Sequence, residues 1–464
     1  MADLAQIWRQ HYEVVPQQLQ QAATGGTVAT AFNTNIDAVV KISGQQLSVW
    51  AEHFALAETD ITAQPSLILA PRDIIRGICK CFIHGIAEEW LIDNAKTADW
   101  LKQNIPHDRL AMGGQAGITA NVAAVLGMKQ VITHTASHPQ AQAAQFLLYA
   151  NLLGFDENSA LKPAHQINRK NEIPLIHHII EFAKDDVLKL GEQTYICPKA
   201  NRFIATYDPA NLALMVNSAF VKHLNQNGYD YLILSGFHNL TTAHNGLSRI
   251  DAIVPLLKQW QQNWPQGVIH LELASTQDKI IRRAVIEKIA PLADSLGLND
   301  REALDVFEVI DAPHFARLQN QPLTAADLFD IALKIKTFTG TPRIQLHMFG
   351  LYFTLQDKDF RISPQQNLHG MLTAAVVAAS KAGNGKIEQA ADLLWAWQNQ
   401  SGEFNFTALQ NLSAHLSAPQ LAATGIIENE KYTLIATPTL LIANPKTLVG
   451  MGDTISAVSL LCAR

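Results

Sequence analysis

The chain has 464 residues and a formal net charge of −6, with 48% hydrophobic and 16% charged residues. This length suits a large α/β domain accompanied by a smaller one. The acidic balance argues against a nucleic-acid-binding face, which is usually basic. No apolar run reaches the roughly 18 residues that a membrane span requires, and the N-terminus lacks the basic and apolar regions of a signal peptide. We therefore expect a cytoplasmic protein that binds neither nucleic acid nor membrane.

The four cysteines, Cys79, Cys81, Cys197 and Cys462, are too few and too scattered to form a disulfide framework. Cys79 and Cys81 could begin a metal site, but no second pair at a suitable spacing completes it. We therefore expect structural thiols.

Apolar strand-like runs alternate with helix-like stretches along most of the chain. After an amphipathic helix up to about residue 21, the first strand is predicted at 27–32, and a helix over 118–126 stops at Gly127. This alternation indicates a parallel sheet with helices on both faces, in which ligands bind at the carboxyl ends of the strands. Further strands are predicted at 130–134, 231–234, 268–274, 295–298, 343–353 and 432–442, and a last helix at 454–461.

Two segments, 41–109 and 166–204, fit the alternation poorly. We expect them to form a smaller lid domain. Residues 1–40, 110–165 and 205–464 are then expected to form the large α/β domain that binds nucleotide and carries out catalysis.

Two glycines and a carboxylate separate the last predicted strand from the last helix, in the order Gly450-Met451-Gly452-Asp453. Glycines allow a tight turn, and the free N–H groups of a helix start bind anions such as a phosphoryl group. A carboxylate there can accept a proton from an attacking hydroxyl. The alternative is an ordinary helix-capping Asp453.

Carboxylates also end two other predicted strands. His270 and Glu272 share one face of their strand, and a buried Glu is costly unless it is paired or bound to a metal such as Mg²⁺. Asn299 and Glu302 are spaced to contact a nucleotide and a metal-bound water, and they equally suit a helix capping box. A solvent-facing Glu272 on an edge strand is the alternative for the first pair.

The segment from Gly113 to Gly117 contains three glycines and Gln115, which offers both a donor and an acceptor to hydroxyl groups. The order of glycines in a dinucleotide fingerprint is absent, which excludes a Rossmann cofactor site. A tight loop without a ligand is the other interpretation.

Taken in order, these motifs resemble the ADP-dependent sugar kinases, the family of ADP-dependent glucokinase and phosphofructokinase. The resemblance runs from about residue 33 to the C-terminus. It implies a ribokinase-like large domain with a lid, a sugar held between them, ADP as phosphoryl donor, AMP as product and Mg²⁺ as cofactor. Its other carriers are Asn33-Thr34-Asn35-Ile36-Asp37-Ala38, Asn201-Arg202-Phe203-Ile204, Leu234-Ser235-Gly236-Phe237-His238 and Gly297-Leu298-Asn299.

The resemblance also implies roles for individual residues. Asp453 is similar to the family's catalytic base, and Gly450, Met451 and Gly452 to its anion hole. Glu272 and Glu302 resemble the magnesium carboxylates. The remaining matches are the nucleotide positions Asn299, His347, Met348, Ile442, Gly452 and Arg202, and the sugar positions Asn35, Asp37, Glu88, Gly114, Gln115 and His177. The family usually has Thr where this chain has Met348, which leaves the donor in question.

The acceptor is expected to be glucose. Residues 176–182 and the run Ala87-Glu88-Glu89 resemble the glucokinase branch, where a His and a Glu contact the sugar. Lys199 and Arg202 keep a phosphofructokinase or a bifunctional enzyme open, because a sugar phosphate needs basic partners. A non-catalytic sugar- or nucleotide-binding protein is the alternative of another class. We expect a monomer or a weak homodimer.

Overall fold

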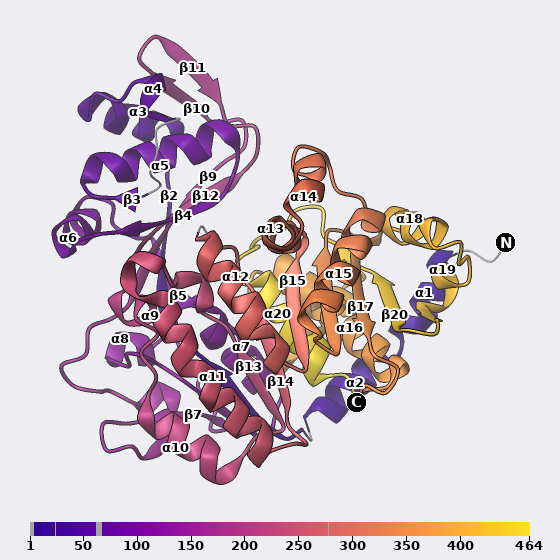
Figure 1. The fold of residues 1–464 in the computed structure, drawn as a ribbon. Helices are drawn as coiled ribbons and strands as arrows, with labels where there is room; N and C mark the ends of the chain where they lie inside the picture. Colours follow the sequence, from indigo (N-terminus) through magenta and orange to yellow (C-terminus); the bar gives the residue numbers. More distant parts are fainter. Residues whose placement is uncertain (1–3, 24, 62–66, 277) are drawn as a thin grey trace.

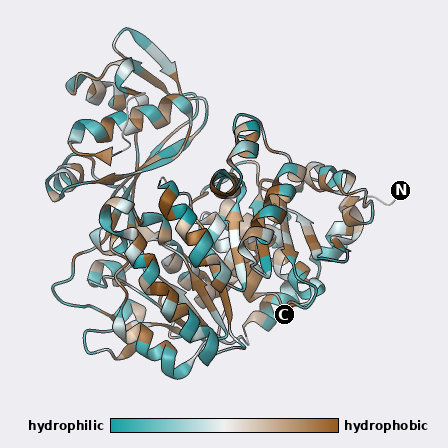
Figure 2. Cartoon of the chain, viewed as in Figure 1, coloured by the Kyte–Doolittle hydropathy of each residue, from teal (hydrophilic) through white to brown (hydrophobic). Residues whose placement is uncertain are grey.

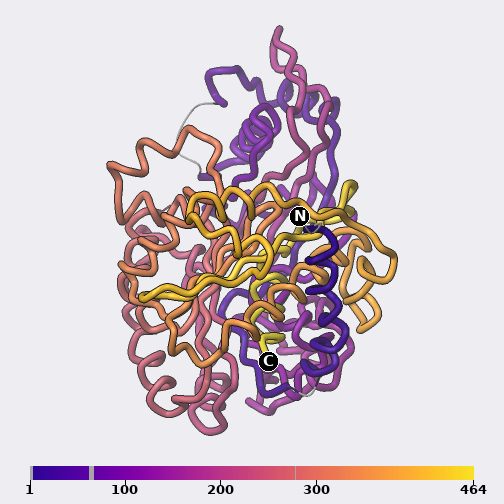
Figure 3. The backbone as a smooth tube through the Cα atoms, turned by 90° about the vertical axis from the view of Figure 1, so that its right-hand side faces the viewer, coloured from indigo at the N-terminus to yellow at the C-terminus, as the bar shows by residue number. Residues whose placement is uncertain are grey.

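The computed structural model describes residues 4–23, 25–61, 67–276 and 278–464. Most of its strands belong to two sheets, one of eleven strands and one of six. The six-stranded sheet and its helices lie at one end of the molecule in both views (Figures 1 and 3). Each sheet packs on its own cluster of buried apolar side chains. The α/β class is confirmed.

The middle of the large sheet is built from short strands that are buried along almost their whole length. Such strands are buried on both faces and therefore suit parallel pairing. The β16–β17, β17–β20, β19–β20 and β7–β8 pairs near the two edges are antiparallel. In sheet order the strands are β19 (Ile426–Glu428), β20 (Thr433–Pro438), β17 (Leu351–Gln356), β16 (Arg343–Met348), β15 (Ser295–Asn299), β14 (Val268–Glu272), β13 (Tyr231–Leu234), β1 (Thr27–Ala31), β6 (Gln130–Thr133), β7 (Leu152–Phe155) and β8 (Leu161–Pro163).

Helices cover the large sheet on both sides (Figure 1). On one face α20 packs against both α7 and α16. On the other face α11, α12, α13 and α15 follow one another, each in contact with the next. Figure 2 shows hydrophobic colour concentrated on the central strands. The helices of this body are α1 (Leu4–Tyr12), α2 (Val15–Ala22), α7 (Gln115–Val125), α8 (Gln140–Ala143), α9 (Pro209–Leu212), α10 (Ser218–Asn227), α11 (Gly246–Asn263), α12 (Lys279–Lys288), α13 (Asp300–Ile310), α14 (Ala312–Leu318), α15 (Ala325–Thr339), α16 (Pro364–Asn384), α17 (Trp395–Gln398), α18 (Thr407–His415), α19 (Leu421–Thr424) and α20 (Met451–Leu461).

The small sheet combines segments that are far apart in the sequence. Its strand order is β3 (Leu67–Ile68), β4 (Glu88–Ile92), β12 (Asn201–Tyr207), β9 (Ile176–Phe182), β2 (Asn35–Lys41) and β5 (Arg109–Gly113). The helices α3 (Gly44–His53), α4 (Glu58–Ile61), α5 (Pro71–His84) and α6 (Ala95–Asn104) and the hairpin of β10 (Val187–Leu190) and β11 (Gln193–Ile196) complete this body.

The boundaries expected for the two bodies need correction. Residues 35–40 were expected in the large domain, but β2 pairs with β5 and β9 of the small sheet. The small body was also expected to end at residues 109 and 204, but its strands β5 and β12 continue to Gly113 and Tyr207. The chain therefore passes from one body to the other directly at the polar residues that follow β1, β5 and β12.

Two predicted elements are also corrected. Residues 343–353 are not one strand, because Phe349 and Gly350 form a two-residue turn between β16 and β17, with Gly350 at a φ of 86°. The N-terminal stretch forms two helices, α1 and α2. Both pack on the C-terminal part of the chain (Figure 3). There Trp8 donates to the carbonyl of Ala422, and Tyr12 donates to that of Pro438.

None of the helices among the described residues is both long enough and apolar enough to cross a membrane. The cysteines are all free and buried, as expected of structural thiols.

Candidate active site

A cleft of about 1640 Å³ lies between the small sheet and the carboxyl ends of the central strands of the large sheet. Its lining comes from both bodies and includes Asn33, Gly114 and Gln115 from the crossing segments after β1 and β5. The α20 turn, the ends of β14, β15 and β16 and the strands β9 and β12 all contribute side chains. Most of the residues that the sequence singled out therefore meet in one place.

The Gly450–Asp453 turn forms one wall of the cleft and begins α20. Gly450 has a φ of 62°, a conformation that favours glycine, and an added Cβ would lie 2.8 Å from Cδ1 of Ile118. Lys381 of α16 fixes the turn from behind, since its Nζ donates to the carbonyl of Gly450 and to Oγ1 of Thr454, both at 2.9 Å. No described side chain caps the start of α20, so its first N–H groups can bind an anion in the cleft.

Asp453 lies in the first turn of α20 and lines the cleft. Burial raises the pKa of its carboxyl, while the Lys381 ammonium and hydrogen bonding from Gln115 lower it. A half-buried carboxylate held next to a cation and an anion-binding helix end can accept a proton from a hydroxyl group bound in the cleft.

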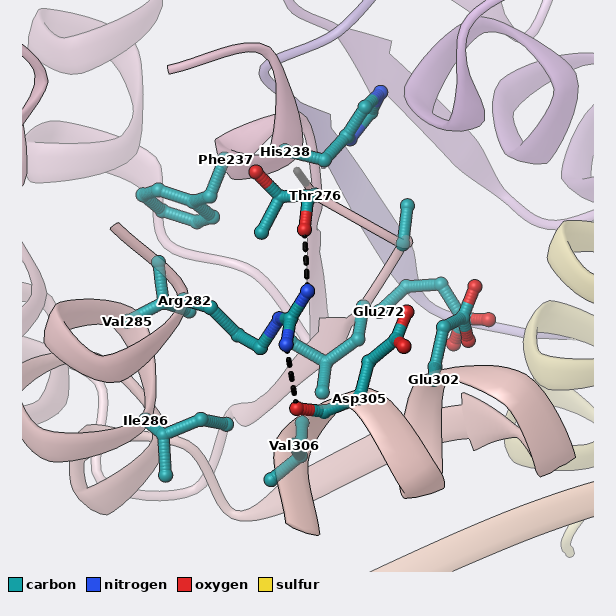
Figure 4. Close-up of a pocket in the computed structure, with 12 residues that line it drawn as sticks. Phe237, His238, Glu272, Thr276, Arg282, Val285, Ile286, Glu302, Asp305 and Val306 are labelled. Atoms are coloured by element: carbon teal, nitrogen blue, oxygen red, sulfur yellow. Dashed lines mark hydrogen bonds between the residues drawn. The ribbon is translucent and has the colours of Figure 1, made fainter. Parts of the chain in front are cut away.

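Glu272 and Glu302 bring two buried carboxylates to the same wall, and their side chains point toward one another (Figure 4). Oε2 of Glu272 lies 3.0 Å from Nε2 of His270, and Glu302 forms a capping box with Asn299 at the start of α13. Burial, followed by the neighbouring carboxylates, raises the pKa of Glu272 well above its usual range. Burial raises the pKa of Glu302 to about 8.

Two adjacent buried carboxylates whose pKa values are both raised fit a divalent cation, which would neutralise both. Mg²⁺ commonly takes one or two protein carboxylates and completes its shell with water and phosphate oxygens. No group of three or more His, Cys, Asp or Glu side chains in the described ranges could hold a metal by itself. Any metal bound by Glu272 and Glu302 would therefore depend on ligands from the substrate and solvent.

Beside this pair is a second, smaller pocket of about 20 Å³, which is large enough for one water molecule (Figure 4). Arg282 of α12 crosses it. Its Nη1 donates to the carbonyl of Asp305 at 2.7 Å and its Nη2 to that of Thr276 at 2.6 Å. Arg282 thereby ties the loop that follows Glu272 to the helix that carries Glu302.

A cluster of acidic groups surrounds His177 at the opposite end of the cleft. Nε2 of His177 lies 3.0 Å from Oδ2 of Asp208, and its Nδ1 lies 3.7 Å from Oε1 of Glu89. Burial alone would lower the pKa of His177, but the bond to Asp208 and the nearby carboxylates raise it. Burial raises the pKa of Asp37, which receives a hydrogen bond from Asn35, to about 6.

Several buried oxygen atoms at this end lack a hydrogen-bond partner among the described residues. They are Oδ1 of Asn33, Oδ1 of Asn35 and Oε1 of Gln115, and all three residues line the cleft beside Gly114. Unpaired buried acceptors are costly. A ligand rich in hydroxyl donors would satisfy them.

Glu88 was expected at the sugar end, and that expectation is wrong. Its carboxylate pairs with Lys80 at 2.8 Å and accepts from Nε1 of Trp90, away from the cleft. Successive residues of a strand point to opposite sides, so Glu89 faces the cleft in its place and accepts from Oγ1 of Thr206 at 2.6 Å.

A more apolar region of the cleft lies beyond the α20 turn. Asn299, His347, Met348 and Ile442 line it together with Phe349, which is 77% exposed. Burial lowers the pKa of His347 to about 4, and its Nδ1 has no partner among the described residues. An exposed aromatic side chain and a buried ring nitrogen that line the same cleft suit a planar base.

Arg202 and Lys199 also line the cleft, on the side of the small sheet. The side chains of these two residues enter no ion pair with the part of the chain that the structure describes. They are available to a negatively charged ligand.

Sequence reasoning did not select Glu89, Asp208 or Lys381 as site residues. Asp208 stands directly before Pro209 at the end of a strand, which is a recognisable helix-capping position. Lys381 is the one Lys or Arg in α16, and it follows an alanine-rich, buried stretch. A cation in such a stretch could have been recognised in the sequence as a candidate site residue. Glu89 could be separated from Glu88 only by knowing which face of β4 meets the cleft.

Comparison with known proteins agrees with these features. A model of the ADP-specific phosphofructokinase/glucokinase conserved region matches residues 26–462. The ADP-specific phosphofructokinase of Methanosarcina acetivorans is 26% identical over 445 residues, covering 92% of this chain and 91% of that protein. The ADP-dependent glucose/glucosamine kinase of Pyrococcus abyssi is 27% identical over 442 residues, covering 93% and 92%.

Solved structures share the fold along almost the whole chain. An ADP-dependent kinase in complex with fructose 6-phosphate and ADPβS superposes with a TM-score of 0.82 and 24% identity, over 98% of this chain and 97% of that one. A reconstructed last common ancestor of the ADP-dependent phosphofructokinases of Methanosarcinales gives 0.78 and 24%, over 99% and 97%.

Proposed function

Because this chain belongs to the family of ADP-specific phosphofructokinases and glucokinases, we propose that it transfers the β-phosphoryl group of ADP to the 6-hydroxyl of glucose. The products are glucose 6-phosphate and AMP. The observation that carries this proposal is the position of Asp453. Asp453 lies in the first turn of α20. It interacts with Gln115, one of the residues with an unpaired acceptor oxygen, and with the carboxylate of Glu272.

In the proposed mechanism Asp453 accepts the proton of the sugar hydroxyl as its oxygen attacks the β-phosphorus. The N–H groups at the start of α20 face the three equatorial oxygens of the transferred group and stabilise their charge. Lys381 keeps the turn in place and adds a positive charge behind it. Phosphoryl transfer depends mainly on such positioning and charge neutralisation.

Glu272 and Glu302 would hold Mg²⁺, which when bound neutralises charge on the phosphates of the donor. The apolar region around Ile442, Phe349 and His347 would receive the adenine. Arg202 would contact a donor phosphate. The small-sheet body would act as a lid that excludes water while the two substrates are bound.

Glucose is favoured as acceptor by the chemistry around His177. Glu89 and Asp37 present carboxylates to the cleft, and carboxylates are strong acceptors for neutral hydroxyl groups. They would repel the phosphate of a sugar phosphate. One relative, the glucose/glucosamine kinase of Pyrococcus abyssi, is named for a sugar without a phosphate.

Fructose 6-phosphate is the second candidate, and a specific observation favours it. Lys199 and Arg202 line the same cleft without an ion pair to the described residues, and a sugar phosphate would supply the missing anion. Several relatives are named ADP-specific phosphofructokinases. An enzyme that accepts both sugars would use both sets of side chains.

A coupled assay with purified protein and Mg²⁺ tests the proposal. Glucose and fructose 6-phosphate are compared as acceptors with ADP as donor, and ATP replaces ADP in parallel reactions. We expect turnover with ADP and glucose and at least tenfold less with ATP, about 1.4 kcal/mol in the transition state. Equal or better turnover of fructose 6-phosphate would replace glucose as the main acceptor. Turnover with ATP but not with ADP would show that ADP is not the phosphoryl donor.

A further inference from the structure

Arg343 is a permanent cation buried in the middle of the large sheet, and nothing in the proposed reaction uses it. Its side chain is fully buried. Among the described residues it donates only to neutral partners, which are Ser295 at 2.7 Å, Gln345 at 2.7 Å and Asn367 at 2.9 Å. Burying a charge is expensive: burial lowers the pKa of Arg343, and only the attraction of the more distant Glu272 carboxylate counteracts this. The retention of Arg343 therefore calls for an explanation.

The strand register shows where this cation acts. Arg343 of β16 lies directly opposite Ser295 of β15, and Ser295 lies opposite His270 of β14. Oγ of Ser295 is 2.9 Å from Nδ1 of His270, and Nε2 of His270 is 3.0 Å from Oε2 of Glu272. One row across three parallel strands thus connects the cation to a carboxylate of the cleft.

The direction of these hydrogen bonds follows from the chemistry of arginine. A guanidinium can only donate, so Oγ of Ser295 must accept from Arg343. The hydroxyl hydrogen is then available to Nδ1 of His270, which must be bare to accept it. A neutral imidazole with a bare Nδ1 carries its hydrogen on Nε2, so His270 donates to Oε2 of Glu272. The reverse order would leave the serine hydrogen without a described acceptor.

The row engages only Oε2 of Glu272, and hydrogen bonding from the Ser456 side chain of α20 also lowers the pKa of this carboxyl. Gly297 makes room for the contact, since an added Cβ there would lie 2.0 Å from Oε2 of Glu272 and 2.8 Å from Nε2 of His270. Oε1 points instead toward the α20 turn, where a Cβ on Gly452 would be 4.0 Å away. One oxygen is therefore held by the protein and the other is presented to the cleft.

We propose that Arg343 is a positioning residue for Glu272, acting through Ser295 and His270 to hold Oε2 as an acceptor and aim Oε1 at the cleft. The inference rests on the proposed function in so far as Glu272 is taken to bind a divalent cation. Partners of this kind orient metal ligands, and their loss typically weakens metal binding by about 10–100-fold.

The test uses Arg343→Met, which removes the cation, and Ser295→Ala, which interrupts the row but keeps the cation. Thr354→Val is the matched control, because Thr354 is equally buried in the adjacent strand β17 and outside the row. ¹⁵N NMR of histidine-labelled full-length protein reports which ring nitrogen of His270 is protonated, with His270→Gln used for assignment. Mn²⁺ titration followed by EPR reports metal binding.

We expect wild type and Thr354→Val to have a bare Nδ1 and a protonated Nε2 at His270. Ser295→Ala and Arg343→Met should lose that single tautomer and bind Mn²⁺ about 10–100-fold more weakly. A protonated Nδ1 in wild type, or wild-type tautomer and Mn²⁺ affinity in folded Ser295→Ala, would overturn the proposal. If Arg343→Met does not fold, Ser295→Ala decides alone.

Sugar phosphorylation is measured separately on the same proteins. Turnover in wild type without the expected tautomer rejects only the role of Arg343. The expected tautomer without turnover of either sugar rejects only the proposed function.

Discussion

Glu302 and Asn299 cap the same helix reciprocally: the Glu302 carboxylate accepts the N–H of Asn299 at 2.8 Å, and the Glu302 N–H donates to Oδ1 of Asn299 at 2.9 Å. The sequence left helix capping and a site carboxylate as alternative roles for Glu302, and the structure shows that this residue both caps α13 and lines the cleft. Capping fixes the carboxylate at the helix start, where it faces Glu272. Structural and chemical roles can be separated by mutation.

Replacing Glu302 with Gln retains an oxygen that can accept the Asn299 N–H but removes the charge. We expect kcat to fall by about 100-fold or more, as for loss of a charged group that acts in the transition state, with little change in stability. Glu302→Ala should lose as much activity and about 1 kcal/mol of stability as well. Steady-state kinetics and urea unfolding measure the two effects. Near-normal kcat in Glu302→Gln would exclude a role in catalysis.

The adjacent pair Glu88 and Glu89 provides a matched test of the acceptor site. Glu89→Ala should lower kcat/KM for glucose by about tenfold or more, equivalent to about 1.4 kcal/mol for one lost charge-assisted hydrogen bond. Glu88→Ala should leave kcat/KM nearly unchanged, because that side chain pairs with Lys80 outside the cleft. Kinetics with glucose and fructose 6-phosphate compare the variants. The opposite ranking would mean that the face of β4 at the cleft is misassigned.

Lys381 should determine the pH range of activity. Its ammonium lowers the pKa of Asp453, and a base must be deprotonated to act. Lys381→Met should therefore move the acidic limb of the kcat profile to higher pH, while Lys381→Arg should leave it near its wild-type position. Burial lowers the pKa of Lys381 itself to about 8, so wild-type kcat should decline above that pH. A pH–rate profile that is identical in all three proteins would contradict this role.

His177 should make stability depend on pH. Its pKa in the folded protein is raised by Asp208, so the folded state holds the proton more tightly than the unfolded state. The resulting stabilisation is complete below the unfolded pKa of about 6.5 and is lost as pH rises through the folded pKa. Denaturant unfolding of wild type and His177→Gln across this range measures the difference. Curves that stay parallel would show that the His177–Asp208 pair contributes nothing to stability.

The sequence predicted the parts of the fold that depend on local patterns. Short apolar runs such as Tyr231–Leu234 are strands because they are buried on both sides, and two glycines before Asp453 do mark the start of a helix. The hairpin at Phe349 and Gly350 escaped notice because apolar residues continue through the turn.

Features that depend on pairing between distant strands could not be predicted. The assignment of residues 35–40 failed because β2 pairs with β9, more than a hundred residues away in sequence. The row from Arg343 through Ser295 and His270 is likewise invisible until the register of β14, β15 and β16 is known. Glu88 was chosen over Glu89 for the same reason, since a shift of one residue reverses the face of a strand.

The central claim is that Asp453 is the catalytic base, and the most direct test is Asp453→Asn in a rapid-quench single turnover with ADP, Mg²⁺ and glucose. We expect the rate of phosphoryl transfer to fall by about 10²–10⁴-fold, while glucose binding, followed by calorimetry, stays within about twofold of wild type. A single-turnover rate close to that of wild type would contradict the account.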